Sequence, residues 1–268
     1  MKADDYIQRL EHTGITNAGQ ETLWLMSYAL SRPHSYILSR KEFSPEEHAK
    51  IEAVISRREA GEPLQYIIGE AEFYGRDFCV GSGVLIPRHD TETLIDAVKK
   101  CIAPEESFAF VDWGTGSGCI AVTLLLEFPN AYAYMIDDSP EALKYAEENI
   151  SRYDLQARTA VNQLPECCRV IISNPPYIPS REIEGLMREV RDYEPITALD
   201  GGNDGMKFYR EIYSLGIRIL EPQGYIILET GNIQQVNSLK VFDDDFIFTG
   251  EVFDDGNFPR ALIFRRRN

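Results

Sequence analysis

The stretch VDWGTGSGCIA at residues 111–121 decides the fold. It joins a short apolar run, Phe108–Asp112, to a helical pattern at 118–127, and three glycines fall within five residues of the join. The glycines are Gly114, Gly116 and Gly118. Such residues let the backbone turn tightly and bring N–H groups close to a ligand at the carboxyl edge of a sheet. A tight turn without a ligand is the plainer alternative, but the flanking strand and helix favour a ligand-binding loop.

The same alternation of apolar runs and helical stretches continues along the chain. The further runs are Ala131–Ile136, Val170–Ser173 and Tyr225–Glu229, and the further helical stretches are 139–151 and 204–220. This order indicates βαβ units and a parallel sheet covered on both faces. At the C-terminus, Asp245–Thr249 and Ala261–Arg265 have no helix-length insert between them and predict an antiparallel pair. The fold class is therefore α/β, with a Rossmann-like, mostly parallel sheet and an antiparallel C-terminal strand.

The N-terminal part of the chain has a different sequence pattern, in which helical stretches occur without strands between them. A helix is predicted from about Asn17 to Ser31, and another begins at Ser44-Pro45 with a capping box closed by Glu47. Residues 1–62 thus predict a small helical domain. Residues 63–83, rich in β-branched and aromatic side chains and interrupted by glycines, predict a β-hairpin linker. We expect residues 84–268 to form the α/β domain that carries the glycine loop.

Composition restricts the classes of function. The 268 residues carry 27 basic and 43 acidic side chains, a formal net charge of −16, which disfavours a nucleic-acid substrate because phosphate backbones are repelled. No signal peptide or apolar membrane span is evident, so we expect a cytoplasmic protein without a membrane partner. The five cysteines are scattered and no histidine cluster accompanies them, which predicts no metal site.

Acidic residues at two strand ends indicate which ligand the glycine loop accepts. Asp112 directly precedes the glycines, where a carboxylate suits a cation rather than a phosphate. Asp137 ends the next apolar run, where it can accept hydrogen bonds from both hydroxyls of a ribose. A ligand with a ribose and a positive charge but no phosphate fits S-adenosyl-L-methionine. Taken alone, Asp137 is compatible with an ordinary surface charge, but the glycine loop makes that interpretation the weaker one.

The most specific motif is Asn174-Pro175-Pro176-Tyr177, which follows the run Val170–Ser173. Two adjacent prolines end a strand and fix φ, so the Asn174 side chain and the Pro175 carbonyl are held in a stiff loop. Both are hydrogen-bond acceptors and together can hold the two N–H groups of a planar –NH2, against which Tyr177 can pack. A rigid strand-ending turn without function is the alternative, and the tetrapeptide after a glycine loop makes it the weaker one.

These motifs together resemble the class I methyltransferases that modify planar nitrogens, and further blocks resemble the HemK/PrmC family of release factor glutamine methyltransferases over essentially the whole chain. The blocks are Pro63–Gly69 (PLQYIIG), Val84–Arg88 (VLIPR), Thr91-Glu92, Glu194-Pro195, Ala198-Leu199, Gly201–Gly205 (GGNDG), and Glu229-Thr-Gly231-x-x-Gln234. The family usually carries PRPETE where this chain has PRHDTE at Pro87–Glu92. It also commonly carries an acid near the adenine, whereas Val161–Leu164 has none.

The resemblance implies a function and its residues. The enzyme would methylate the side-chain amide nitrogen (N5) of the glutamine in the Gly-Gly-Gln loop of peptide chain release factors, as a monomer, with the helical domain recognising the partner. Cofactor residues would be Asp112, Gly114, Thr115, Gly116, Ser117, Gly118, Asp137 and Asn174. Catalytic and substrate-binding residues would be Asn174, Pro175, Pro176 and Tyr177. No general base is nominated, because an amide N–H is too weak an acid for an ordinary side chain to remove.

Two other classes of function share some of these features. A methyltransferase of adenine or guanine amino groups in nucleic acid would share the tetrapeptide and the loop, but should carry a basic surface or a target-recognition domain. A protein that only binds a partner would be expected to have a disrupted loop or tetrapeptide. The charge of −16 disfavours the first and the intact motifs disfavour the second.

Overall fold

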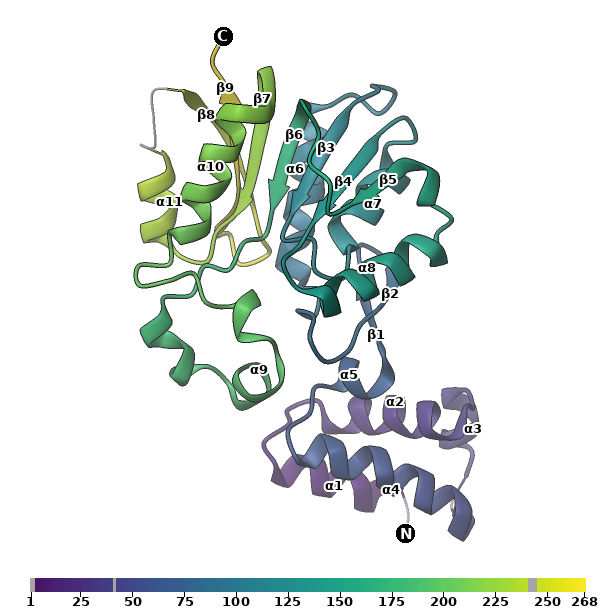
Figure 1. Cartoon of the computed structure of the whole chain (residues 1–268). Coiled ribbons are helices and arrows are strands. Elements are labelled where there is room, and N and C mark those ends of the chain that lie inside the picture. Colours follow the sequence, from purple (N-terminus) through teal and green to yellow (C-terminus); the bar gives the residue numbers. More distant parts are fainter. Residues whose placement is uncertain (1–2, 41, 241–244) are drawn as a thin grey trace. The chain divides into compact units, whose positions relative to one another are not determined.

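The computed structural model describes residues 3–40, 42–240 and 245–268. The chain divides into two units, which can be followed by colour in Figure 1. The larger unit comprises Ala71–Leu186 and Glu194–Asn268, and the smaller comprises the described residues up to Glu70 together with Met187–Tyr193. Among the described residues, no helix combines the length and the apolar character needed to cross a membrane.

A seven-stranded sheet forms the centre of the larger unit, with strand order β5-β4-β3-β6-β7-β9-β8. The strands are β3 (Ala109–Trp113), β4 (Tyr132–Ile136), β5 (Thr159–Val161), β6 (Cys168–Ser173), β7 (Leu220–Glu229), β8 (Phe246–Phe253) and β9 (Pro259–Arg266). Neighbouring strands from β5 to β7 are parallel, whereas β9 pairs antiparallel with both β7 and β8. The predicted α/β sheet with an antiparallel C-terminal pair is therefore confirmed.

The strand order places a topological switch point between β3 and β6. From β3 the chain runs outward through β4 and β5, and then returns to the other side of β3 as β6. Register pairs Asp112 with Ile172, so the carboxyl ends of β3 and β6 lie side by side at one edge of the sheet. Ligands of open α/β folds bind at such a point. The glycine loop and the tetrapeptide follow these two strands directly.

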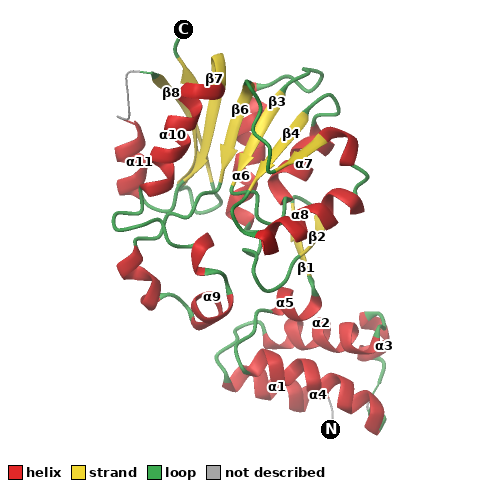
Figure 2. Ribbon diagram, in the orientation of Figure 1, coloured by secondary structure: helices red, strands yellow, loops and turns green. Residues whose placement is uncertain are grey.

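Successive residues of the central strands face opposite sides of the sheet, which gives the unit two apolar cores. Phe110 contributes to the core that holds α6 (Glu92–Cys101), α7 (Cys119–Glu127) and α8 (Pro140–Arg152), while Val111 contributes to the other. That second core holds α10 (Lys207–Ile219) and α11 (Ile233–Lys240) (Figure 2). Helices on both faces explain why the strands read as continuous apolar runs.

Shorter 3₁₀ turns connect these elements. They are η1 (His89–Thr91), η2 (Gln156–Arg158), η3 (Ser180–Gly185) and η4 (Ile196–Ala198). The turn η1 leads directly into α6 and positions Thr91 at the start of that helix, where its side chain is buried.

The smaller unit is helical and has a core of its own. Its helices are α1 (Ala3–His12), α2 (Ala18–Leu30), α3 (His34–Leu38), α4 (Pro45–Glu59), α5 (Leu64–Ile68) and α9 (Arg188–Tyr193). The predicted capping box of α4 is present, with Glu47 N donating to Ser44 Oγ at 3.2 Å and Ser44 N donating to Glu47 Oε2 at 2.8 Å. The unit also includes α9 from far along the chain, and Arg58 of α4 forms an ion pair with Glu189 of α9 at 3.0 Å.

The hairpin expected over residues 63–83 is shorter than predicted. Residues Leu64–Ile68 form α5, a helical turn that ends at Gly69 with φ of 85°. The two-stranded sheet comprises only β1 (Glu70–Phe73) and β2 (Arg76–Cys79). Tyr74 and Gly75, the two residues between the strands, both have positive φ, as a type I′ hairpin turn requires. Pro63 before the turn and Gly69 after it are start and stop signals for a helix, and they outweigh the β propensity of the isoleucines.

Candidate active site

The glycine loop after β3 has a backbone that only glycine adopts easily. Gly114, Gly116 and Gly118 have φ of 72°, 56° and 79°. A Cβ added to Gly114 would meet no atom within 4 Å, whereas one on Gly118 would lie 2.8 Å from Met135 Cε. The loop therefore packs against β4 and α8 at its end and faces open space at its beginning. That open side, lined by backbone, fits the close approach of a ligand.

Asp112, near the end of β3, fixes this loop through hydrogen bonds from residues further along the sequence. Its side chain is fully buried, and Oδ2 accepts hydrogen bonds from Thr115 Oγ1 at 2.7 Å and from the Ala121 N–H at 3.2 Å. Burial raises the pKa of Asp112 to about 7. Oδ1 is buried and accepts no hydrogen bond within the described ranges of the chain. A buried acceptor without a partner at a glycine loop fits the cationic part of S-adenosyl-L-methionine.

Asp137 lies after β4 and faces the same loop. Its Oδ2 accepts from the Gly116 N–H at 2.8 Å and its Oδ1 accepts from the Ser139 N–H at 2.9 Å. Burial is the main cause that raises the pKa of Asp137. A carboxylate has about four acceptor positions, so both oxygens can still take ribose hydroxyls. Asn162 orients this residue, because its Oδ1 accepts from the Asp137 N–H at 3.2 Å.

Asn149 of α8 also holds the glycine loop, through the backbone of Ser117. The buried Asn149 side chain donates to the Ser117 carbonyl at 2.9 Å and also exchanges hydrogen bonds with the backbone of Cys79. The loop is thereby tied to α8 and to the end of β2.

The tetrapeptide begins directly beside the glycine loop. Ser173 Oγ, at the end of β6, donates to the Trp113 carbonyl at 2.6 Å, which joins the two strand ends. Asn174 Nδ2 donates to Thr91 Oγ1 at 3.0 Å. In the part of the chain that the structure describes, Asn174 Oδ1 and the Pro175 carbonyl accept no hydrogen bond. These two acceptors are the pair that the sequence predicts for a planar –NH2 group.

Tyr177 is fixed at its ring, its hydroxyl and its backbone. Its Oη donates to Glu229 Oε1 at 3.3 Å, and its carbonyl accepts from Gln235 Nε2 at 2.7 Å. A Cβ added to Gly231 would lie 2.3 Å from the ring, and one on Gly205 would lie 2.5 Å from the Tyr177 carbonyl. Burial raises the pKa of Tyr177, so the hydroxyl stays protonated and donates.

Gln235, which holds the Tyr177 carbonyl, was not singled out by the sequence analysis. Gln234, the last residue of the resembling block after β7, is exposed, whereas Gln235 is buried. Gln235 Oε1 also accepts from the Gly231 N–H at 2.9 Å, so one amide braces both the glycine and the tyrosine. On α11, which begins at Ile233, only the second glutamine points toward the tetrapeptide.

Replacing Gly231 by alanine should impair the site without unfolding the protein. The new methyl group would overlap the Tyr177 ring, and the ring would have to move away from Glu229. We expect a loss of kcat of about 10²-fold, because a misplacement of about 1 Å at a reacting centre has effects of that order. Gly250→Ala is the matched control, since a Cβ there would come no nearer than 3.8 Å to Ile263. Equal kcat for the two variants would contradict the role assigned to the Tyr177 ring.

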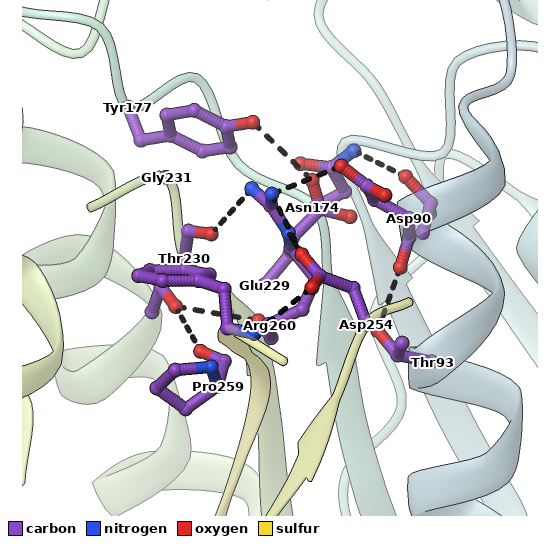
Figure 3. A network of polar contacts seen from close by, with 12 residues as sticks. Asp90, Thr93, Asn174, Tyr177, Glu229, Thr230, Gly231, Asp254, Pro259 and Arg260 are labelled. Atoms are coloured by element: carbon purple, nitrogen blue, oxygen red, sulfur yellow. Dashed lines mark hydrogen bonds and ion pairs between the residues drawn. The ribbon is translucent and has the colours of Figure 1, made fainter. Parts of the chain in front are cut away.

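A network of charged groups supports the tetrapeptide from β9 (Figure 3). Arg260 donates to Asp254 Oδ2 at 3.0 and 3.1 Å and to the Thr230 carbonyl at 3.0 Å, and it lies 2.9 Å from Asp90 Oδ2. Asp90 stands where the family usually has glutamate. Its carboxylate keeps the negative charge of that position and forms the ion pair with Arg260. On the other side of η1, Arg88 donates to the buried Glu194 at 2.5 Å.

The structure thus brings the predicted loop residues and the predicted tetrapeptide to one edge of the sheet. Sequence reasoning missed the supporting residues Thr91, Gln235, Arg260, Asn149 and Asn162. Thr91 was quoted only as part of a resembling block, and Asn162 only for the missing acid. In the described ranges, no group of three or more His, Cys, Asp or Glu side chains is arranged to hold a metal ion.

A mostly parallel sheet with a glycine loop after β3, an acidic residue after β4 and the Asn-Pro-Pro-Tyr tetrapeptide after β6 defines a class I methyltransferase fold. A methyltransferase of known structure from Pyrococcus furiosus has the same fold, with a TM-score of 0.50 and 16% identity over 81% of this chain and 98% of that one. Residues 4–69 match the family model described as the PrmC N-terminal domain, and residues 89–189 match the one described as the methyltransferase small domain.

Curated relatives name the family. The release factor glutamine methyltransferase of Geobacter sulfurreducens is 42% identical over 240 residues, which cover 87% of this chain and 84% of that protein. The protein of the same name from Koribacter versatilis is 39% identical over 217 residues, covering 79% and 78%. The chain belongs to the release factor glutamine methyltransferase family.

Proposed function

We propose that this protein transfers a methyl group from S-adenosyl-L-methionine to the side-chain amide nitrogen of a glutamine in peptide chain release factors. The observation that carries the proposal is a pair of acceptors held beside the glycine loop, Asn174 Oδ1 and the Pro175 carbonyl, to which no described residue donates a hydrogen bond. Two acceptors in a stiff loop match the two N–H groups of a primary amide.

The residues that would hold the cofactor surround the open side of the loop. Gly114, Thr115 and Gly116 present backbone to it, and Ser117 and Gly118 carry the turn into α7. Asp137 would take the ribose hydroxyls, and Asp112 would face the positively charged end through its Oδ1. Asn174, at the neighbouring strand end, would border both the cofactor and the amide. The bound cofactor supplies an activated methyl group on a cationic sulfur.

The task of the tetrapeptide is to orient the amide. Hydrogen bonds to Asn174 Oδ1 and the Pro175 carbonyl would hold the –NH2 plane and direct the nitrogen lone pair at the methyl carbon. They would also stabilise the positive charge that develops on this nitrogen during transfer. Positioning of this kind can supply on the order of 7–11 kcal/mol. Pro176 stiffens the loop, and Tyr177 would pack against the amide.

No side chain needs to remove a proton before transfer. The amide N–H is a very weak acid until the nitrogen has gained the methyl group, and the proton then leaves readily to water. The buried carboxylates Asp112 and Glu229 are already engaged with Thr115 and Tyr177. Acceptors rather than a base are therefore what the site offers the reaction.

The Gly-Gly-Gln loop of release factors is the substrate that we infer, with the helical unit contributing to partner recognition. A nucleic-acid base is the other planar –NH2 substrate, and the net charge of −16 disfavours it. Incubating the protein with labelled cofactor and an equimolar mixture of a release factor and total RNA and DNA separates the two. We expect label in the release factor alone. Label in nucleic acid and none in the release factor would overturn the proposal.

A further inference from the structure

The turn η1 carries Thr91, the residue that contacts the side chain of Asn174. Thr91 is buried, with 3% of its surface exposed, and its Oγ1 accepts from Asn174 Nδ2 at 3.0 Å. An amide carries its N–H donors and its acceptor oxygen on the same carbon, so fixing Nδ2 at Thr91 also fixes Oδ1. The position of Thr91 therefore determines where the acceptor of Asn174 points.

An ion pair fixes Asp90, the residue directly before Thr91 (Figure 3). Asp90 Oδ2 lies 2.9 Å from Arg260 Nη2 on β9. Arg260 is itself firmly held, because its guanidinium donates to Asp254 Oδ2 at 3.0 and 3.1 Å and to the Thr230 carbonyl at 3.0 Å. Only 15% of the Arg260 side chain is exposed. The guanidinium is thus a fixed point at the end of the sheet to which η1 is attached.

We propose that the ion pair between Asp90 and Arg260 positions Asn174 for methyl transfer by holding Thr91 in place. Asp90 and Arg260 are then positioning residues, and Thr91 transmits their effect to the tetrapeptide. The inference rests on the proposed function, because it gives a use to the direction of Asn174 Oδ1.

Other contacts keep η1 folded when this ion pair is removed. Thr93 Oγ1 donates to the Asp90 carbonyl at 2.7 Å, and Arg88, directly before η1, donates to the buried Glu194 at 2.5 Å. A change limited to the Asp90 side chain leaves both contacts in place, and Arg260 keeps its other acceptors. Removing the Asp90 carboxylate should therefore shift the end of the turn without unfolding the protein.

Asp90→Ala should lower kcat on a release factor by about fivefold to tenfold. The Asp90 side chain is 47% exposed, so solvent screens the ion pair, and the expected loss is smaller than that for a group at the reacting centre. The KM for S-adenosyl-L-methionine should change by less than about twofold, because the glycine loop is untouched. Asp90→Glu, which keeps a carboxylate, should restore most of the lost kcat. Asp77→Ala on β2 removes one exposed negative charge elsewhere and should keep kcat.

A double-mutant cycle tests whether Asp90 acts through Thr91. Thr91→Val removes the acceptor of Asn174 Nδ2 and nearly keeps the shape, and we expect kcat to fall by about 10²-fold. Once Thr91 no longer accepts from Asn174, the position of η1 has no effect to transmit. The variant with both changes should therefore match Thr91→Val in kcat within about twofold, whereas independent losses, including those from a general destabilisation, would multiply.

The outcomes separate the two proposals. Multiplied losses in the double variant, or equal kcat for Asp90→Ala and Asp77→Ala, would overturn the positioning role and leave the proposed function intact. A wild-type protein that labels no release factor would contradict the proposed function instead. The side-chain –NH2 resonances of Asn174 then decide the positioning role, because Asp90→Ala should shift them and Asp77→Ala should not. Unshifted Asn174 resonances in Asp90→Ala would overturn that role.

Discussion

Asn174→Ala should slow methyl transfer by about two orders of magnitude or more while the protein still binds its cofactor. The substitution removes one of the two acceptors for the substrate amide, Oδ1, and leaves Thr91 Oγ1 without its donor. Removing one preorganised group that stabilises developing charge typically lowers kcat by about 10²–10³-fold. The dissociation constant for S-adenosyl-L-methionine should change by less than about tenfold, since one lost hydrogen bond is worth roughly 1–1.5 kcal/mol. Single-turnover transfer and calorimetric binding measure the two quantities separately.

Asn174→Asp serves as the matched variant for this test. It keeps an oxygen at the place of Oδ1 but replaces the –NH2 that faces Thr91 with a second oxygen. If a donor must face Thr91 and an acceptor must face the substrate, Asn174→Asp should also have a low kcat, although the side chain keeps its size. Wild-type turnover in Asn174→Ala would remove the residue from the mechanism.

Asp137→Ala should weaken cofactor binding by about 10–10²-fold, which corresponds to roughly 1–3 kcal/mol for groups left unsatisfied. The carboxylate accepts from the N–H groups of Gly116 and Ser139, so its loss releases the glycine loop as well as the ribose site. The kcat at saturating cofactor should fall much less, because the tetrapeptide is untouched. Isothermal titration calorimetry with S-adenosyl-L-methionine measures the effect.

The neighbouring Asp138 is the control for charge. It is exposed, so Asp138→Ala removes one negative charge at nearly the same place and leaves the hydrogen bonds to Gly116 and Ser139 intact. The two variants should therefore differ by about tenfold or more in Kd. Equal dissociation constants would show that Asp137 acts only through its charge and would exclude the ribose contact.

The parts of the fold that could be predicted from sequence are those specified by residues close together in the chain. The capping box at Ser44 and the glycine loop at 111–121 each depend on residues a few positions apart, and both are present. The apolar runs of β3, β4, β6 and β7 were recognisable because a sheet buried on both faces needs them. The linker was less predictable, because Leu64–Ile68 combines strand-forming side chains with a proline and a glycine that favour a helical turn.

The supporting residues of the site could not be predicted because their partners are far away in the chain. Asn174 and Thr91 are 83 residues apart, and Tyr177 and Gln235 are 58 apart. No periodicity links such positions, and the choice between Gln234 and Gln235 depends on which face of α11 is buried. The residues that the sequence does single out belong to stiff loops at strand ends, where proline and glycine indicate the backbone conformation.

Tandem mass spectrometry of a release factor tests the central claim most directly. The factor would be incubated with the protein and S-adenosyl-L-methionine and digested, and the peptide that contains the Gly-Gly-Gln sequence would be fragmented. The account predicts one added methyl group on the side-chain nitrogen of that glutamine, formed by the wild-type protein and formed at least about 10²-fold more slowly by Asn174→Ala. A methyl group on another residue, or an unmodified peptide with the wild-type protein, would contradict it.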